Sequence, residues 1–259
     1  MDRAFVLADF DAQMRADPPA ELGVERAWVD GVLRTTGAYN LIGWWDFPAA
    51  RAMEIAAREA AFFAGQDLEW KVFSHDGPPG LEAALAASGF APDRLETFLV
   101  LDLDAAPALG ADHAMEVRRV TDEAGAADVA AVHAAAFGRE TPGRLEQLAA
   151  RLGDPTQALF VAYEGRRPVS SGRLELAPGR AFAGLYGGGT VPDYRGRGAY
   201  RALVAARAAE ARRRGCRYLT VDALETSRPI LERLGFQPLA TVRAWMLAPP
   251  AEADPPLSR

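Results

Sequence analysis

Lysine, cysteine and histidine are scarce in this chain of 259 residues, and their scarcity excludes several kinds of site. Lys71 is the only lysine, so the chain has no Gly-Lys-Ser/Thr phosphate loop of the nucleotide-binding kind. Cys216 is the only cysteine, which excludes an internal disulfide and a cysteine-rich metal site. His75, His113 and His133 are scattered without the spacing of metal ligands. We therefore predict that no metal is bound.

Long apolar runs and excess positive charge are also lacking. No stretch of about 18 apolar residues occurs, so no membrane span is predicted. The N-terminus, MDRAFVLADFDAQ, lacks the basic start and long apolar run of a secretory signal. A formal net charge of −6 argues against a general nucleic-acid binder. With 49% hydrophobic and 25% charged residues, the composition is that of a globular protein, which we expect to be cytoplasmic.

One stretch, TVPDYRGRGAYRALV at 190–204, organises the rest of the chain. It follows an apolar run with glycines, 181–190, that predicts a strand. It continues into a run, 200–214, that predicts a helix. The sequence thus predicts a strand that turns through glycines directly into a helix.

Such a turn is suited to binding an anion. The first turn of a helix presents free backbone N–H groups at the positive end of the helix dipole. Gly196 and Gly198 lack side chains that would keep a phosphate away, and Arg195 and Arg197 add positive charge. The pattern favours a pyrophosphate site. The alternative is a solvated basic turn that only caps a core helix.

Periodicity and turn residues predict alternating strands and helices in the first part of the chain. The predicted elements are a helix at 1–16, a hairpin at 25–35 around Asp30-Gly31, a strand at 39–45, a helix at 49–64, a strand at 68–73, a helix at 81–87 and a strand at 95–103. A linker rich in Ala, Pro, Gly and Asp is predicted at 105–114, and a disordered tail at 249–259.

The same signals predict a longer series of elements between 115 and 248. They are a strand at 115–120, a helix capped by Thr121 with Val129, Val132, Ala136 and Phe137 on one face, a helix marked by Leu145, Leu148 and Leu152, strands at 158–163, 169–176 and 181–190, a helix at 200–214, a strand at 217–221, a helix at 229–234, and a strand ending at Leu247.

This order of elements and the glycine-arginine loop together resemble the GNAT acyltransferase superfamily. The coenzyme A loop of that family reads Arg/Gln-x-x-Gly-x-Gly/Ala. Arg195, Gly198 and Tyr200 occupy its three positions here, and Tyr200 departs from the small residue that the family prefers. The resemblance covers 115–247. It implies an α/β (α+β) fold with a mixed sheet flanked by helices, acetyl-CoA as co-substrate, and a small-molecule or peptide amine as acceptor.

An internal repeat extends the resemblance to the first half. Residues 72–101 align without gaps over 218–247, and Gly89-Phe90 meets Gly235-Phe236. Chance similarity between two strand–helix–strand units is the alternative. We interpret the chain as a tandem of two GNAT-like units, in which 1–104 is shortened and degenerate.

The first unit is predicted to lack a phosphate site, because WWDFPAARAM at 44–53 contains no Arg-x-x-Gly-x-Gly. Its Trp44 and Trp45 are interpreted as core residues. The repeat also aligns Asp76 with Asp222, each interpreted as the end of a strand. The second unit, 115–248, is the predicted acyltransferase domain.

The resemblance implies where coenzyme A would bind. It would lie where the strands at 181–190 and 217–221 separate, and Gly187-Gly188-Gly189 indicates a bulge where backbone approaches the pantetheine. The cofactor-binding residues that the resemblance implies are Gly189, Thr190 and Val191 for the pantetheine, and Arg195, Gly196, Arg197, Gly198, Ala199, Tyr200 and Arg201 for the pyrophosphate.

The expected reaction is direct attack of an amine on the thioester of acetyl-CoA in a ternary complex. It needs a base for the amine and a polarised thioester oxygen, and a proton donor for the thiolate helps. Many family members place a tyrosine where this chain has Leu231. The remaining candidate acids and bases are Glu175, Asp222, Tyr186, Ser227 and Glu225. The structural alternatives are that Glu175 faces solvent, Asp222 caps a turn and Tyr186 packs. The alternative function is a catalytically silent protein that binds or senses coenzyme A.

Overall fold

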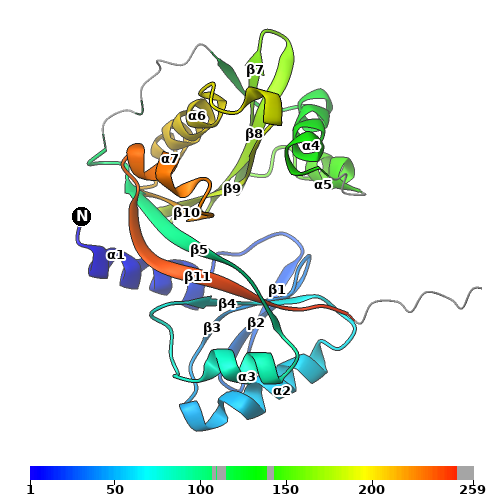
Figure 1. The fold of residues 1–259 in the computed structure, drawn as a ribbon, viewed down its shortest axis with the longest axis vertical. Helices are drawn as coiled ribbons and strands as arrows, with labels where there is room; N and C mark the ends of the chain where they lie inside the picture. Colours follow the sequence, from blue (N-terminus) through cyan, green and yellow to red (C-terminus); the bar gives the residue numbers. More distant parts are fainter. Residues whose placement is uncertain (107–108, 110–114, 139–142, 250–259) are drawn as a thin grey trace, which may run out of the picture. The chain divides into compact units, whose positions relative to one another are not determined.

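The computed structural model describes every residue except 107–108, 110–114, 139–142 and 250–259 (Figure 1). Most of the predicted linker and nearly all of the predicted tail therefore lie outside the described residues.

The chain forms two compact units that are interleaved along the sequence. Unit 1 contains residues 1–13 and 97–239, and unit 2 contains 14–96 and the segment from 240 onward. The predicted domains, 1–104 and 115–248, were inferred from a sequence repeat, which this division into compact units does not test. Their boundaries stay a prediction. The predicted α/β fold class, a mixed sheet flanked by helices, is confirmed.

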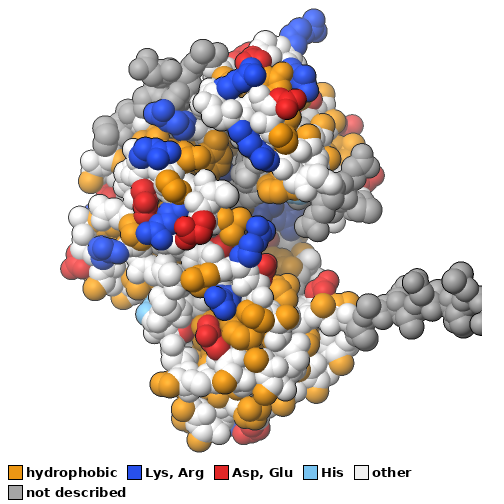
Figure 2. Space-filling view, in the orientation of Figure 1, with side chains coloured by type: hydrophobic (Ala, Val, Ile, Leu, Met, Phe, Trp, Pro, Cys, Tyr) orange, Lys and Arg blue, Asp and Glu red, His pale blue; other side chains and the backbone are white. Residues whose placement is uncertain are grey.

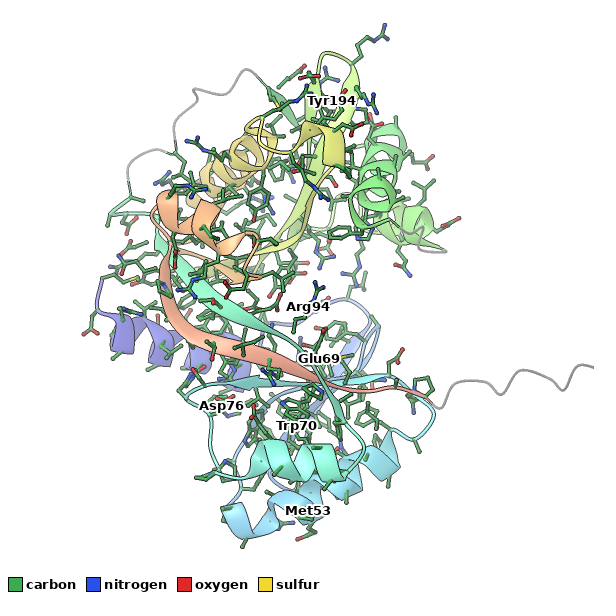
Figure 3. All side chains as sticks on the ribbon, in the orientation of Figure 1. Met53, Glu69, Trp70, Asp76, Arg94 and Tyr194 are labelled. Carbon is green, nitrogen blue, oxygen red and sulfur yellow. The ribbon has the colours of Figure 1, made fainter. Side chains whose placement is uncertain are left out.

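Unit 2 is built on a sheet in the order β1-β2-β3-β4-β11. Its elements are β1 (Val24–Val29), β2 (Val32–Gly37), β3 (Leu41–Trp45), α2 (Ala52–Phe62), β4 (Leu68–Phe73), α3 (Leu81–Ala87) and the second half of β11 (Gln237–Leu247). Asp30 and Gly31 join β1 and β2 with positive φ, the geometry of tight hairpin turns. Side chains of α2 and α3 pack on one face of the sheet around Trp70, which is fully buried (Figure 3).

A buried ion pair joins the start of unit 2 to its sheet. Arg15 follows helix α1 (Arg3–Phe10) in a short π-helical segment, Asp11–Ala16. Its guanidinium donates to both carboxylate oxygens of Asp76, at 2.9 and 2.7 Å, and stacks on the ring of Phe73. Asp76 also accepts the N–H of Phe73 at 2.8 Å, so its carboxylate is committed to the turn after β4.

Unit 1 is built on a sheet in the order β5-β10-β9-β8-β7-β6, in which only β9 and β10 pair in parallel. Besides α1, its elements are the second half of β5 (Ala91–Asp102), β6 (Glu116–Arg119), α4 (Glu123–Phe137), α5 (Arg144–Ala150), β7 (Gln157–Glu164), β8 (Arg167–Leu176), β9 (Phe182–Thr190), α6 (Ala199–Arg213), β10 (Tyr218–Ala223), α7 (Arg228–Arg233) and the first residues of β11.

The helices of unit 1 lie on both faces of this sheet. Alternate residues of a strand point to opposite faces, and those of β7 enter two different core clusters. Ala158 and Phe160 pack with Leu203 of α6, whereas Leu159 and Val161 pack with α4. Figure 1 accordingly shows α6 and α4 on opposite sides of β7 and β8.

The sheet of each unit contains a strand from the other half of the sequence. The end of β5, from the first half, pairs with β10 between residues 97 and 102. The end of β11, from the second half, pairs with β4 between residues 242 and 247. Neither sheet is therefore complete without residues from both halves.

Several local predictions are wrong in detail. The cap of α4 is Asp122 rather than Thr121, because the Asp122 carboxylate accepts the N–H of Gly125 at 2.8 Å. Phe137, predicted on the buried face, is 50% exposed, since it occupies the last turn of α4. Asp222 lies inside β10, whereas Asp76 lies in the turn after β4, so the two aspartates are not equivalent strand ends.

Candidate functional site

Strands β9 and β10 separate after a short parallel pairing. Their ladder joins Phe182–Gly184 to Tyr218–Thr220 and ends there. Beyond this point β9 continues to Thr190 along β8, and β10 continues to Ala223 along β5. The two strands therefore follow different neighbours, and their facing edges have backbone groups that this ladder does not use.

Strand β9 bulges in its separated part, as predicted from its three glycines. Ser171 on β8 pairs with Gly189, but Arg173 pairs with Tyr186, so β9 has one extra residue in this interval. Gly187 has φ +57°, which favours glycine. The bulge thus places Gly187 and Gly188 outside the regular register.

The other two glycines make room for helices. A Cβ on Gly188 would lie 3.1 Å from the Tyr200 ring of α6. A Cβ on Gly189 would lie 2.9 Å from Cβ of Ala136 and 3.0 Å from the Phe137 ring of α4. These glycines therefore allow α6 and α4 to approach the sheet closely.

The backbone of the segment predicted to hold pantetheine is partly engaged within the protein. The N–H of Val191 donates to the carbonyl of Val169, and the Ser170 hydroxyl donates to the carbonyl of Gly189. Because backbone groups alternate between the two sides of a strand, the N–H of Thr190 points away from β8. Of the three residues, Thr190 has the N–H directed toward the separated edge.

The predicted phosphate loop leads directly into α6. A short 3-10 turn, Pro192–Tyr194, precedes it, and Gly196 and Gly198 have φ of +76° and +89°. Gly198 is the N-cap of α6; no side chain caps this helix end, and its first turn contains no acidic residue. The first N–H groups of a 15-residue helix are thus left without a side-chain acceptor.

The arginines of the loop have different roles. Arg195 donates to the carbonyls of Thr190 at 3.2 Å and Ala136 at 3.1 Å, so it ties the loop to the ends of β9 and α4. Arg197 and Arg167 lie on the Tyr194 ring, with Cζ 5.0 and 5.1 Å from its centroid. Arg197 also lies 3.4 Å from Glu164.

These cations gather over one end of unit 1. Figure 2 shows blue side chains around the β7–β8 hairpin, and Figure 3 places Tyr194 beside it. Arg201, in the first turn of α6, is also exposed. Arg167 and Arg197, beside Tyr194, and Arg201, in the first turn of α6, are therefore the cations near this loop, whereas Arg195 is an internal tie.

Tyr200, which replaces the small residue of the family pattern, points into the protein. Its ring packs against the core and Gly188. Burial raises the pKa of its hydroxyl, and nearby Arg207 partly opposes this shift. The larger side chain is thus accommodated by the glycine of β9 and is directed into the interior.

Three of the predicted catalytic residues share one face of the sheet. Glu175 of β8 and Thr220 of β10 both lie opposite Gly184 of β9. Tyr186 and Asp222 are each two residues further along their strands, which places them on the same face. Tyr186 and Asp222 lie on the two separated strands, Tyr186 on β9 and Asp222 on β10.

Glu175, Ser227 and Leu231 are engaged in contacts within the protein. Glu175 forms a 2.5 Å ion pair with Arg173, which also lies near the Tyr186 ring. The Ser227 hydroxyl donates to the carbonyl of Leu224 at the start of α7. Leu231 is fully buried in the unit 1 core.

A pocket of about 540 Å³ lies within unit 2 and contains none of the predicted site residues. Its walls include Phe73, Asp76, Pro79, Leu81 and Arg243. Within the described part of the chain, no group of three or more His, Cys, Asp or Glu residues could hold a metal ion. Nor do the described residues include a helix long and apolar enough to cross a membrane.

Comparison with protein families bears directly on unit 1. The model of the Acetyltransferase (GNAT) family matches residues 127–236. Residues 127–236 are a GNAT-family domain. The match runs from within α4 to the residue before β11 and includes the separated strands, the bulge and the α6 loop.

Solved structures share the fold over most of the chain. A GCN5-related N-acetyltransferase from Kribbella flavida is similar with a TM-score of 0.67 at 14% identity, over 94% of this chain and 93% of that one. A functionally unknown conserved protein from Staphylococcus epidermidis gives 0.62 at 12%, over 87% and 94%. A tandem GNAT protein from the clavulanic acid biosynthesis pathway gives 0.58 at 17%, over 95% and 93%. No significant match was found among curated proteins.

Proposed function

We propose that the protein is an N-acyltransferase that moves an acetyl group from acetyl-CoA to an amine. One observation carries the proposal: in the unit with the GNAT match, β9 and β10 separate beside a long helix whose first N–H groups have no side-chain cap. The separated edge suits an extended pantetheine, and the helix start suits a pyrophosphate.

The cofactor would be held by backbone and charge together. In the proposal, the first N–H groups of α6, from Gly198 to Arg201, meet the pyrophosphate, and Arg167 and Arg197 add charge beside it. The N–H of Thr190 faces the pantetheine along β9. Arg195 acts indirectly, since its guanidinium is used to fix the loop.

The chemistry requires an amine without its extra proton. The amine nitrogen attacks the thioester carbonyl carbon, the carbon–sulfur bond breaks, and the thiolate leaves with the electron pair. Asp222 is the first candidate to take the amine proton, because it lies on the separated part of β10. Tyr186, across the opening on β9, is the candidate to protonate the thiolate. Glu175 ranks lower as a base, since its carboxylate is paired with Arg173.

The second candidate function is a protein that binds coenzyme A without transferring an acyl group. Leu231 favours it, because a buried leucine stands where many GNAT enzymes have a tyrosine. The enzyme would take as acceptor a small molecule or a peptide with a free amine. The protein that only binds coenzyme A would transfer nothing to such an amine.

Calorimetry with acetyl-CoA, combined with thiol release over a panel of amines, aminoglycosides, amino acids and peptides, tests both functions. We expect one site per chain and release that depends on the amine. Binding without release for any amine would support the silent protein. An absence of binding would contradict both functions.

A further inference from the structure

Arg207, in the middle of α6, is a buried arginine that none of the steps above uses. Its side chain is 1% exposed. Nε donates to the carbonyl of Leu203, one turn earlier in the helix, and Nη1 donates to the carbonyl of Arg173 on β8, each at 3.2 Å. The Arg173 carbonyl adjoins the register break that the bulge of β9 produces. Arg207 therefore ties α6 to the sheet at the bulge.

The guanidinium has no compensating charge nearby. Among the described residues no carboxylate acts on Arg207, and its Nη2 has no hydrogen-bond partner. Burial lowers the pKa of Arg207 to about 10, which leaves the group protonated at neutral pH. An unpaired buried charge is unfavourable for folding, and an apolar side chain of similar size in its place is often at least as stable.

Two strands leave space for this cation. A Cβ on Gly172 of β8 would lie 2.8 Å from Nη1 and 2.9 Å from Cζ of Arg207. A Cβ on Gly188 of β9 would lie 3.8 Å from Nη2 and 3.1 Å from the Tyr200 ring. The guanidinium and the Tyr200 ring thus fill the volume under the bulge that the two glycines leave open.

We infer that Arg207 is a positioning residue for acyl transfer, which holds the β9 bulge at the geometry that presents the thioester. The inference rests on the proposed function, in which the separated edge of β9 binds the acyl-CoA. A purely structural role would be filled better by an apolar side chain, because the charge is uncompensated. In this inference the arginine serves the geometry of the site rather than folding.

The test compares three variants of the full-length protein. Arg207→Met should lower kcat by about 10- to 100-fold through a misplaced thioester, while the Kd for coenzyme A changes less than about 3-fold. Its melting temperature should stay the same or rise. Arg207→Lys, which keeps the charge, should recover part of the kcat.

Arg212→Met is the matched control on the same helix. Arg212 also donates to backbone carbonyls, those of Leu103 at 3.0 and 2.9 Å and Ala106 at 2.9 Å, away from the bulge. It should lower the melting temperature and leave kcat unchanged. If Arg207→Met instead lowers the melting temperature as Arg212→Met does, or leaves kcat unchanged, the inference is overturned.

A fourth variant, Gly172→Ala, tests the same contact from the side of the sheet. Gly172→Ala places a methyl group against the guanidinium and should lower kcat in the wild-type background. In the Arg207→Met background the same change should have little further effect, as for two residues acting through one contact. Additive losses would count against the inference. Failure of the wild-type protein to bind coenzyme A would instead contradict the proposed function.

Discussion

Arg201→Glu separates the folding of α6 from its proposed role in binding phosphate. Arg201 is exposed in the first turn of α6, where no acidic residue is present. A carboxylate there interacts favourably with the helix dipole, so the free energy of unfolding should rise by roughly 0.3–1 kcal/mol. The same carboxylate should repel a bound pyrophosphate. Stability and affinity are thus expected to change in opposite directions.

The loss of affinity can be calculated from simple electrostatics. Two unit charges about 7 Å apart in water interact by about 0.6 kcal/mol. Arg201→Glu changes the charge of the side chain by two units, and this change acts on two phosphate charges. The interaction energy therefore changes by about 2.4 kcal/mol before screening. At physiological ionic strength, screening leaves about 1 kcal/mol, or about a 5-fold higher Kd; at 0.01 M salt about 1.9 kcal/mol, or about 25-fold, should remain.

Calorimetric titration with coenzyme A at the two salt concentrations measures this effect, and a thermal melt measures stability. Arg213→Glu is the control, since it makes the same charge change about 18 Å further along α6. Arg213 pairs with Glu210 at 2.6 Å near the helix C-terminus, so this variant should lose stability and keep its affinity. An Arg201→Glu effect that is absent, or equal at both salt concentrations, would show that α6 does not begin at the phosphate site.

Three further predictions concern catalysis and folding. Leu231→Tyr should overpack the core, lower the free energy of unfolding by about 1–3 kcal/mol and leave kcat no higher; a 10-fold gain in thiol release would contradict this. Asp222→Asn should lower kcat about 100-fold, whereas Glu175→Gln should change kcat less than about 3-fold; the reverse ranking would move the base to Glu175. A chain ending at Leu239 should lose the strand that pairs with β4, and its unit 2 should exchange amide hydrogens rapidly; unchanged protection in β4 would contradict the observed pairing.

The glycine-arginine loop could be found from the sequence because its information is local. Gly196, Gly198 and the apolar runs on either side lie within one short segment, and the structure has the predicted strand, turn and helix there. The open start of α6 follows from the same segment, since no capping residue stands at Gly198. The roles of these residues in binding coenzyme A stay predictions.

Features that depend on distant residues were not predictable in the same way. Arg207 lies in a helix rich in arginine, a pattern typical of a solvated surface, and its burial depends on Gly172 and Gly188 of two other strands. The role of Arg195 as a tie depends on the carbonyl of Ala136, far away in the sequence. Such contacts become visible only when the strands and helices are assembled.

The exchange of strands between the halves affects how the chain can be made. Strand β4 is synthesised early, but its partner in β11 is among the last described residues. At about 5–20 residues per second, a ribosome needs roughly 8–30 s to reach that partner after finishing residue 96. During this interval one edge of β4 has no strand beside it and is open to wrong pairing. A nascent chain stalled before β11 should therefore remain a substrate for chaperones, although its first 96 residues have long been complete.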